Sequence, residues 1–414
     1  MQDAVLLDLR LQAYRFALKV KPRQRQLLRQ FAGACRYFAN RGLALQQEFY
    51  DLTGVHAGYA DLCAVVTGWK QDPETAWLNA MPSQALQQSL KDLESGWNRY
   101  FDGLAERPAF RKKGDRDSFR YPQGFNLDQS NQRIFLPKLG WVRYRSSRAV
   151  KGTVKNVTVS LSGGRWFVSI QTEREVERPV HPSTSEVGID LGVVRFATLS
   201  NGEVIASDSA CGKQSDRLRK AQQSLNRKEK FSRNWKKARA RVQRVHARIA
   251  NARRDFLHKT TTTISKNHAV VYVEDLKVKN MSRSAKGNLA KPGKNVRAKA
   301  GLNRAILDQG WAEFRRQLGY KLNWKGGELI VVPPHYTSQT CPACGHVAAA
   351  NRRTQAEFAC VECGYRNHAD LVGAINVLRA GHARIACQVS SAVMLPAAGT
   401  NLSGQTGSMP VLAA

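Results

Sequence analysis

The stretch Val187-Gly188-Ile189-Asp190-Leu191-Gly192-Val193 decides the fold of the larger part of this chain. It is typical of a short apolar strand that carries one acid, Asp190, in its middle. Burying a lone carboxylate is costly unless the carboxylate is paired or binds a metal ion. A turn aspartate is the simpler alternative, but strand-forming residues flank Asp190 on both sides. The pattern therefore favours a buried acid with a partner.

Two further acids occupy comparable positions later in the chain. The continuous apolar run 269–273 is typical of a buried parallel strand, and it ends in Glu274 and Asp275. Asp370 opens a predicted helix, where an acid also suits the helix dipole, so that Asp370 alone would be taken for an N-cap. The residues do not decide between Glu274 and Asp275. The order of acids, strands and helices predicts an RNase H-like α/β domain that gathers carboxylates around paired Mg²⁺ or Mn²⁺ ions.

Four cysteines lie between the second and third acids. Cys341 and Cys344 form one Cys-x-x-Cys pair, and Cys360 and Cys363 form another after 15 intervening residues. A single pair could be a redox motif, but two pairs at this spacing predict a tetrahedral zinc site. Because four cysteines leave no open coordination position, we expect this zinc ion to be structural.

The charge of the chain indicates its partner class. In 414 residues, 65 Lys and Arg residues oppose 32 Asp and Glu residues, which gives a formal net charge of +33. A surplus of this size repels itself unless a polyanion neutralises it, which favours nucleic acid over an acidic membrane surface. No run of 18 or more apolar residues predicts a membrane-spanning helix. The length predicts two or three folded units.

Residues 213–259 form the most basic part of the chain, with 17 Lys and Arg residues against three acids. Apolar residues at alternating spacings of three and four from Trp235 to Phe256 predict a helical hairpin. A solvated face usually mixes both signs of charge, and this one does not, so we expect it to contact phosphates. The candidate nucleic-acid-binding residues are Arg227, Lys228, Lys236, Lys237, Arg241, Arg244 and Arg248.

Periodicity divides the remainder of the chain. Residues 13–20 alternate as a strand, and residues 22–102 are helical, with Ser83 as a candidate N-cap. Alternation on both sides of Gly163-Gly164 predicts a hairpin. We expect a linker at 171–185 and a mobile loop at 278–304.

Several motifs together resemble one known family. They are Gly188-Ile-Asp-Leu-Gly192, Arg254-Asp-Phe-Leu-His-Lys259, Val273-Glu-Asp-Leu-Lys277, Tyr336-Thr-Ser-Gln-Thr-Cys341 with the cysteine pairs, Ala369-Asp-Leu371, Pro108-Ala-Phe-Arg-Lys-Lys113 and Leu136-Pro-Lys-Leu-Gly-Trp141. In this order, from about residue 13 to 380, the chain closely resembles TnpB, the OrfB-type protein of bacterial insertion sequences. That family is related to compact type V CRISPR effectors.

The resemblance implies an RNA-guided DNA endonuclease, with Asp190, Glu274 and Asp370 as catalytic and Mg²⁺-binding residues. The resemblance identifies Glu274, rather than Asp275, as the second catalytic acid. A guide RNA from the element's end and target double-stranded DNA would be the partners, and a short motif beside the target would be recognised by the N-terminal domains. The implied domains are a β-barrel-like wedge (1–21 and 103–178), a helical recognition domain (22–102), a split RuvC-like nuclease domain (179–338 and 367–387), a zinc ribbon (339–366) and a disordered tail (388–414).

The third acidic motif departs from the family pattern. Many relatives carry an Asp-Arg-Asp-x-Asn-type motif, whereas this chain reads His368-Ala369-Asp370-Leu371-Val372. The central aspartate is kept, while the first acid, the arginine and the asparagine are missing. We expect metal binding to survive this change.

Two other functions remain open at this point. The first is a DNA- or RNA-binding repressor, or a transposition accessory protein, without cleavage activity. The second is a recombinase, because strand transfer uses the same metal chemistry as hydrolysis. In each case we expect a cytoplasmic, nucleoid-associated bacterial protein of unknown oligomeric state.

Overall fold

The computed structural model describes residues 7–114, 117–288 and 290–393. These residues divide into two compact units. The first unit is Met1–Pro179 with Ala210–Ala252, and the second is Val180–Ser209 with Arg253–Ala414. Among the described residues, no helix is long and apolar enough to cross a membrane.

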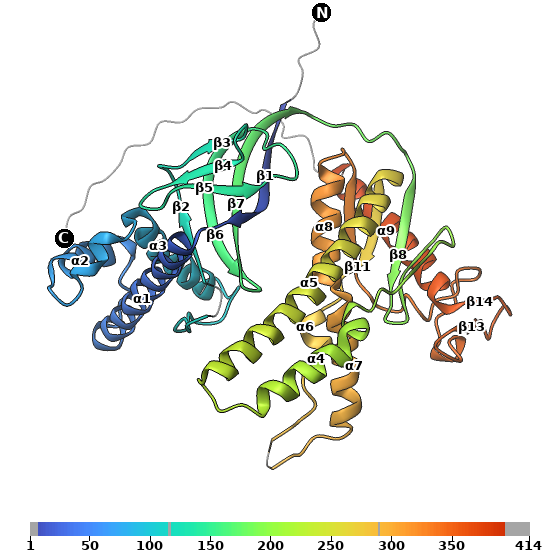
Figure 1. Cartoon of the computed structure of the whole chain (residues 1–414). Coiled ribbons are helices and arrows are strands. Elements are labelled where there is room, and N and C mark those ends of the chain that lie inside the picture. The colour runs from blue at the N-terminus through green and yellow to red at the C-terminus, as the bar shows by residue number, and fades with distance from the viewer. Residues whose placement is uncertain (1–6, 115–116, 289, 394–414) are drawn as a thin grey trace, which may run out of the picture. The chain divides into compact units, whose positions relative to one another are not determined.

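A seven-stranded sheet forms the centre of the first unit, in the order β2-β6-β7-β1-β5-β4-β3 (Figure 1). Every pairing in it is antiparallel. The predicted alternation is confirmed, because Tyr14, Phe16 and Leu18 point into the core from β1. The strands are β1 (Leu7–Lys19), β2 (Ser118–Tyr121), β3 (Asn126–Asp128), β4 (Arg133–Leu136), β5 (Gly140–Arg145), β6 (Thr153–Ser162) and β7 (Arg165–Glu177).

Helices between β1 and β2 share a continuous hydrophobic core with this sheet. They are α1 (Pro22–Thr53), α2 (Tyr59–Gln71), the 3-10 helix η1 (Ala76–Ala80) and α3 (Ser83–Phe101). The prediction that Ser83 caps α3 is wrong. Pro82 holds the N-cap position, and the Ser83 hydroxyl instead accepts a hydrogen bond from Lys70 Nζ at 3.2 Å.

The predicted linker at 171–185 is wrong over its first half. The hairpin around Gly163-Gly164 is confirmed, but its second strand, β7, continues to Glu177. There it pairs with β1 residues from Leu7 onward, which lie before the strand predicted at 13–20. Polar residues alternate along this stretch because one face of the strand is exposed. Without knowledge of the partner strand, such a polar stretch is easily taken for a linker.

The predicted helical hairpin is present. Helix α4 (Ala210–Asn226) and helix α5 (Arg233–Asn267) contact each other through a small apolar cluster that includes Leu218, Val245 and Ile249. Val245 and Ile249 are positions of the predicted apolar seam, and Leu218 contacts them from α4. The C-terminal part of α5, from Arg253, belongs to the second unit.

The second unit contains a mixed five-stranded sheet in the order β10-β9-β8-β11-β12. The predicted buried strand is β11, which runs parallel to both β8 and β12. Two helices, α8 (Trp311–Asn323) and α9 (Ala369–Val393), contact strands of this sheet (Figure 1). The strands are β8 (Glu186–Leu191), β9 (Arg195–Leu199), β10 (Val204–Ala206), β11 (Val270–Glu274) and β12 (Glu328–Val332).

Helix α9 lies very close to the sheet because glycines stand at the contact points. A side-chain carbon added at Gly188 of β8 would lie 2.6 Å from the backbone nitrogen of Leu378 and would also clash with the carbonyl oxygen of Ala374. Gly381 of α9 leaves space in the same way for the ring of Tyr272 on β11. The helix and the two strands therefore hold one another in a fixed register.

The remaining elements correct two predictions. The expected loop at 278–304 contains α6 (Val278–Met281) and the first half of α7 (Val296–Gln309). The disordered tail expected at 388–414 is wrong for its first residues, because α9 continues to Val393, and residues 394–414 lie outside the described part of the chain. Between β12 and α9 lie η2 (Ala349–Asn351), β13 (Glu357–Ala359) and β14 (Arg366–His368).

Candidate active site and metal centre

Asp190, Glu274 and Asp370 come from three different elements of the second unit. Asp190 lies in β8, and Glu274 is the last residue of β11, the neighbouring parallel strand. Asp370 lies in the first turn of α9. Burial raises the pKa of Asp190 to about 7, and the negative charges of Glu274 and Asp370 contribute to this rise. The structure thus brings the three carboxylates into one electrostatic cluster.

Glu274 and Asp275 have different surroundings although they are adjacent in sequence. Glu274 is buried, and its Oε1 accepts a hydrogen bond from Thr337 Oγ1 at 2.6 Å. Burial raises the pKa of Glu274. Asp275 forms ion pairs with Lys277 at 2.5 Å and with Arg315 at 2.7 Å, and hydrogen bonds from these two groups lower its pKa. Asp275 is therefore engaged in local ion pairs, whereas Glu274 belongs to the carboxylate cluster.

Helix α9 positions parts of the cluster beyond its own Asp370. One turn later, Gly373 makes room for Asp190, because a side-chain carbon added there would lie 3.2 Å from Asp190 Cγ. A further turn on, the buried Asn376 donates hydrogen bonds to the carbonyl oxygens of Thr337 and Thr340, each at 2.7 Å. Since Thr337 in turn holds Glu274, one helix is connected to all three acids.

Arg352 is a charged neighbour that the sequence did not reveal. It follows η2, between the two cysteine pairs, and its positive charge opposes the rise in the pKa of both Asp190 and Glu274. Its Nη2 donates a hydrogen bond to the carbonyl oxygen of Gln355 at 3.3 Å. No local motif marks this arginine, since its position depends on how the cysteine-rich segment folds back.

The altered third motif has a structural role of its own. His368 immediately precedes α9, and its Nδ1 accepts a hydrogen bond from the backbone N–H of Asp370 at 3.2 Å. His368 thus provides an N-terminal cap for the helix that carries Asp370. Ala369, which stands where many relatives have arginine, is buried in a small core with Phe358 and Val372.

The four cysteines form one compact cluster. Their sulfur atoms all lie within 4.8 Å of one another, and the distances from Cys341 to Cys363 and from Cys344 to Cys360 are both 3.6 Å. Gly345 and Gly364 follow the two pairs with φ of 77° and 75°, the left-handed conformation that closes each turn. The sulfur set and its spacing fit a tetrahedral zinc ion.

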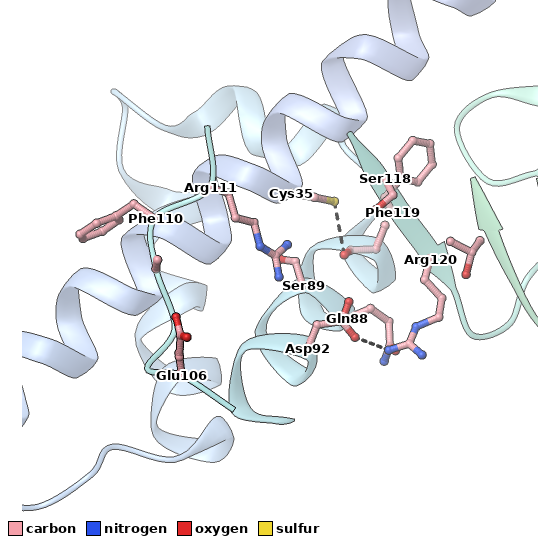
Figure 2. Close-up of a pocket in the computed structure, with 13 residues that line it drawn as sticks. Cys35, Gln88, Ser89, Asp92, Glu106, Phe110, Arg111, Ser118, Phe119 and Arg120 are labelled. Atoms are coloured by element: carbon pink, nitrogen blue, oxygen red, sulfur yellow. Dashed lines mark hydrogen bonds and ion pairs between the residues drawn. The ribbon is translucent and has the colours of Figure 1, made fainter. Parts of the chain in front are cut away.

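The first unit contains a polar cavity of about 810 Å³ (Figure 2). Its walls come from α3, the segment 106–111 and β2, and Cys35 and Phe119 contribute apolar surface. Arg120 and Asp92 form an ion pair in one wall, and Arg111 extends from the opposite side. The backbone of Arg111 is held in place by two hydrogen bonds with the side chain of Asn40.

The candidate nucleic-acid-binding residues lie on the helical hairpin. Lys236, Lys237, Arg241, Arg244 and Arg248 are all exposed along α5. Arg227 and Lys228 are exposed at the C-terminal end of α4. Because all seven side chains are exposed, every one of these charges is accessible to a phosphate backbone.

The fold and the clustered cysteines define a class of multidomain, mixed α/β protein. Residues 169–285 match the family model OrfB_IS605, described as "Probable transposase". Residues 311–377 match "Cas12f1-like, TNB domain", and residues 10–54 match the helix-turn-helix domain of the OrfB_IS605 group. The second match contains all four clustered cysteines and Asp370.

Known relatives place the chain within one family. It is 55% identical over 378 residues to "Putative RNA-guided DNA endonuclease InsQ" of Escherichia coli strain K12, which covers 91% of this chain and 94% of that protein. It is 35% identical over 334 residues to a Streptomyces pristinaespiralis protein with the same functional name, with 80% of this chain and 79% of that protein covered. The chain belongs to the OrfB, or TnpB, family.

A solved structure shows the same fold at low sequence identity. The match is a Cas12f1–sgRNA–target DNA complex, with a TM-score of 0.53 and 13% identity, and it covers 86% of this chain and 83% of that one. The backbone fold of this chain is therefore similar to that of a type V effector.

Proposed function

We propose that this protein is an RNA-guided, Mg²⁺-dependent DNA endonuclease encoded by a transposable element, and that it cuts target DNA beside a short flanking motif. The observation that carries the proposal is the cluster of Asp190, Glu274 and Asp370. Relatives over nearly the whole length of the chain are named RNA-guided DNA endonucleases, which supports the same activity here.

The carboxylate cluster fits divalent metal ions. Burial and the negative charges of Glu274 and Asp370 raise the pKa of Asp190, so a cation would stabilise its charged form, and hard carboxylate oxygens suit Mg²⁺ or Mn²⁺. Asp190, Glu274 and Asp370 would hold the metal. Bound metal would supply an activated water and would stabilise the leaving oxygen of a phosphodiester.

The surrounding residues have distinct parts in this proposal. The Thr337 hydroxyl fixes Oε1 of Glu274 by donating a hydrogen bond to it. Arg352 supplies positive charge beside Asp190 and Glu274, where it would attract the phosphate of a DNA strand. We assign the mixed sheet and α9 to a RuvC-like, RNase H-type nuclease domain on the order of its strands and acids.

The first unit would recognise nucleic acid. Its antiparallel sheet corresponds to the β-barrel-like wedge domain, and α1 to α3 correspond to the helical recognition domain. The cavity in Figure 2 offers Gln88, Arg111 and Arg120, whose side chains can pair with base edges, next to the apolar surface of Phe119. We propose that this cavity reads part of the flanking motif.

The exposed cations of α5 would follow the phosphate backbone of the guide RNA or the target DNA. In this scheme base pairing reads the sequence, and the protein reads backbone shape and the flanking motif. The four-cysteine cluster would hold a structural zinc ion.

Co-purified RNA gives the decisive test. The protein is purified, the bound RNA is extracted and sequenced, and the reconstituted complex is incubated with Mg²⁺ and a DNA library that carries the matching target. We expect one abundant structured RNA and cleavage beside a common motif. Asp190→Ala should lower the cleavage rate to below about a thousandth while RNA binding stays intact. Full cleavage by this variant would contradict the active-site assignment.

The same experiment separates the alternatives. A binding protein without catalysis would retain the RNA and the target but produce no cut ends. A recombinase would produce joined DNA strands instead of free ends. An absence of bound RNA would favour a simple DNA-binding protein.

A further inference from the structure

A second cavity adjoins the carboxylate cluster and lies entirely within the second unit. Its volume is about 290 Å³, and Glu274 forms part of its wall. The other walls come from the ends of β8 and β11, from the segment that leads into α6 and from the start of α8. Because Glu274 belongs both to this wall and to the cluster, a molecule in the cavity lies next to the proposed site of cleavage.

The inner walls of the cavity are apolar. Leu191, Leu276 and Val278 are half-buried there and pack against the hydrophobic core of the second unit. Trp311 and Phe314, two buried aromatic residues of α8, line the cavity as well. Apolar and aromatic walls of this kind are typical of sites that hold a flat, largely apolar group.

The exposed part of the lining carries polar and charged groups. Lys277, Asn280 and Arg315 all line the cavity. Asp275 pairs with both cations, with Lys277 at 2.5 Å and with Arg315 at 2.7 Å. Since two cations share one acid, positive charge remains beside the cavity to attract a phosphate group. The amide of Asn280 can both donate and accept hydrogen bonds, as the edge of a nucleobase can.

The size and the charge of the cavity select its occupant. Small-molecule sites usually measure roughly 300 to 1,000 Å³, so a cavity of about 290 Å³ suits one base and not a base pair. A base that is stacked and paired in a duplex cannot enter such a space, so the strand must be unstacked at this nucleotide. An apolar protein side chain would match the inner walls but would make no use of the positive charge beside them.

We propose that this cavity binds one unpaired nucleobase of the cut DNA strand, from a nucleotide next to the scissile phosphate. The apolar walls hold the base, Asn280 contacts its edge, and the charge of Lys277 and Arg315 attracts its phosphate. These residues position the strand at Glu274 and take no part in the chemical step. The inference rests on the proposed nuclease function and adds to it a binding site for one nucleotide of the substrate.

A scan with abasic nucleotides provides the first test. The complex with its co-purified RNA cuts matched targets in which one nucleotide of the cut strand lacks its base, and the abasic position is moved along the strand past the cut. Rates are measured in single turnover at saturating protein. We expect the rate to fall by about 5- to 100-fold at one position beside the cut, the range of a contact between a base and an aromatic wall. Equal rates at every position beside the cut would overturn the proposal.

Filling the cavity provides the second test. Ala312 is exposed and lines the cavity, so Ala312→Phe places a ring in the space of the base without changing a charge. This variant should cut intact DNA more slowly by a similar factor, and the abasic nucleotide should then cause no further loss. Wild-type rates on intact DNA, or two losses that multiply, would contradict the proposal. If the variant does not fold, as judged by thermal unfolding, the abasic scan decides alone.

Ala383→Phe is the matched control, because it makes the same change at an exposed position of α9. Its neighbour His382 contacts Glu186, which lies at the opposite end of β8 from Leu191 and the cavity. Ala383→Phe should cut intact DNA at the wild-type rate and should remain sensitive to the abasic nucleotide. Equal slowing by Ala312→Phe and Ala383→Phe would show a general effect of an added ring and would overturn the assignment of the cavity.

A binding measurement separates this inference from the proposed function. A fluorescent adenine analogue replaces the base in the same series of targets, and its emission is measured in complexes of the Asp190→Ala protein, where no cleavage is needed. At one position the emission should change when Ala312→Phe is added, and it should not change with Ala383→Phe. A wild-type protein that never cuts would contradict the proposed function, and this measurement would then decide the inference. Emission that is insensitive to Ala312→Phe at every position would overturn it.

Discussion

At the scale of single residues, uncharged groups hold the carboxylate cluster in place. Thr337 lies 63 residues from Glu274 in sequence and still donates a buried hydrogen bond to it. Asn376 fixes the backbone at Thr337 and Thr340. Gly373 leaves the space that Asp190 occupies. A buried carboxylate keeps one orientation only when such partners satisfy it.

Thr337→Val should disturb the site without removing an acid. Valine has nearly the same shape as threonine but cannot donate to Glu274, so cleavage or metal affinity should fall by about 10- to 100-fold. Thr337→Ser keeps the hydroxyl and should retain most activity. The measurements are the cleavage rate as a function of Mg²⁺ concentration and Mn²⁺ binding by calorimetry in the absence of DNA. Equal behaviour of the two variants would show that the hydroxyl has no such role.

The sequence indicated the clustered acids, but it did not indicate the residues that surround them. Asp190 stood out because an acid in an apolar strand requires a partner, and the structure supplies Glu274 and Asp370 close by. Local pattern could not separate Glu274 from Asp275, because their difference lies in contacts with Thr337 and Arg315, which are distant in sequence. Arg352 was not predicted for the same reason.

At the scale of elements, α9 organises the candidate site. It carries Asp370, makes room for Asp190 at Gly373 and holds the segment before Cys341 through Asn376. Arg379 of the same helix also donates to the carbonyl oxygen of Pro342. The ribbon and the carboxylate cluster are therefore attached to the same helix.

Gly188→Ala should separate α9 from β8. The added methyl group would meet the backbone of α9 near Leu378, and backbone cannot move aside as a flexible side chain can. We expect a loss of about 1–3 kcal/mol in the free energy of unfolding, measured by chemical denaturation. Gly301→Ala is the control, because it lies in α7 with open space around it and should be neutral or slightly stabilising. A Gly188→Ala protein of unchanged stability would contradict the close packing described here.

Cys360→Ser should damage both the ribbon and cleavage. Loss of one ligand opens the four-cysteine cluster, and the hydrogen bonds from α9 to Thr340 and Pro342 transmit the change toward Thr337. We expect loss of bound zinc, measured by atomic absorption, together with a lower cleavage rate. Cys63→Ser, which changes a cysteine outside the cluster, should keep both. Full cutting by a zinc-free Cys360→Ser protein would show that the ribbon is independent of the site.

Element boundaries were predictable where burial alternates with a clear period. The strand at β11 and the hairpin of β6 and β7 followed from such patterns. The end of β7 was missed because its partner, the start of β1, lies about 160 residues earlier, and only the pairing explains its polar alternation. The basic start of α7 was taken for a loop because charge and nearby glycines concealed its helical period.

At the scale of the whole molecule, the formal net charge of +33 sets the conditions under which the protein is stable and specific. A chain with this charge binds polyanions without regard to sequence, so base pairing and the flanking motif must supply discrimination. The basic hairpin concentrates part of this charge on exposed helix surface.

Replacing Lys236, Lys237, Arg241, Arg244 and Arg248 with alanine should weaken RNA binding in a salt-dependent manner. Each lost phosphate contact reduces the slope of log affinity against log salt concentration by up to about 0.9. We expect a total reduction of about 3 to 4, measured by titration at several salt concentrations. Lys259→Ala, which removes a cation already paired with Asp255 at 2.7 Å, should change the slope by less than about 1. An unchanged slope in the five-residue variant would exclude the hairpin as a phosphate-binding surface.

The position of Asp370 on α9 has a consequence for biosynthesis. The ribosome produces Asp190 and Glu274 well before α9, which is the last element that the structure describes. A nascent or prematurely terminated chain therefore presents the basic hairpin and two acids but lacks the third. Under the proposed function, such a chain can bind nucleic acid before it can cut, which delays the hazardous activity until α9 has been made.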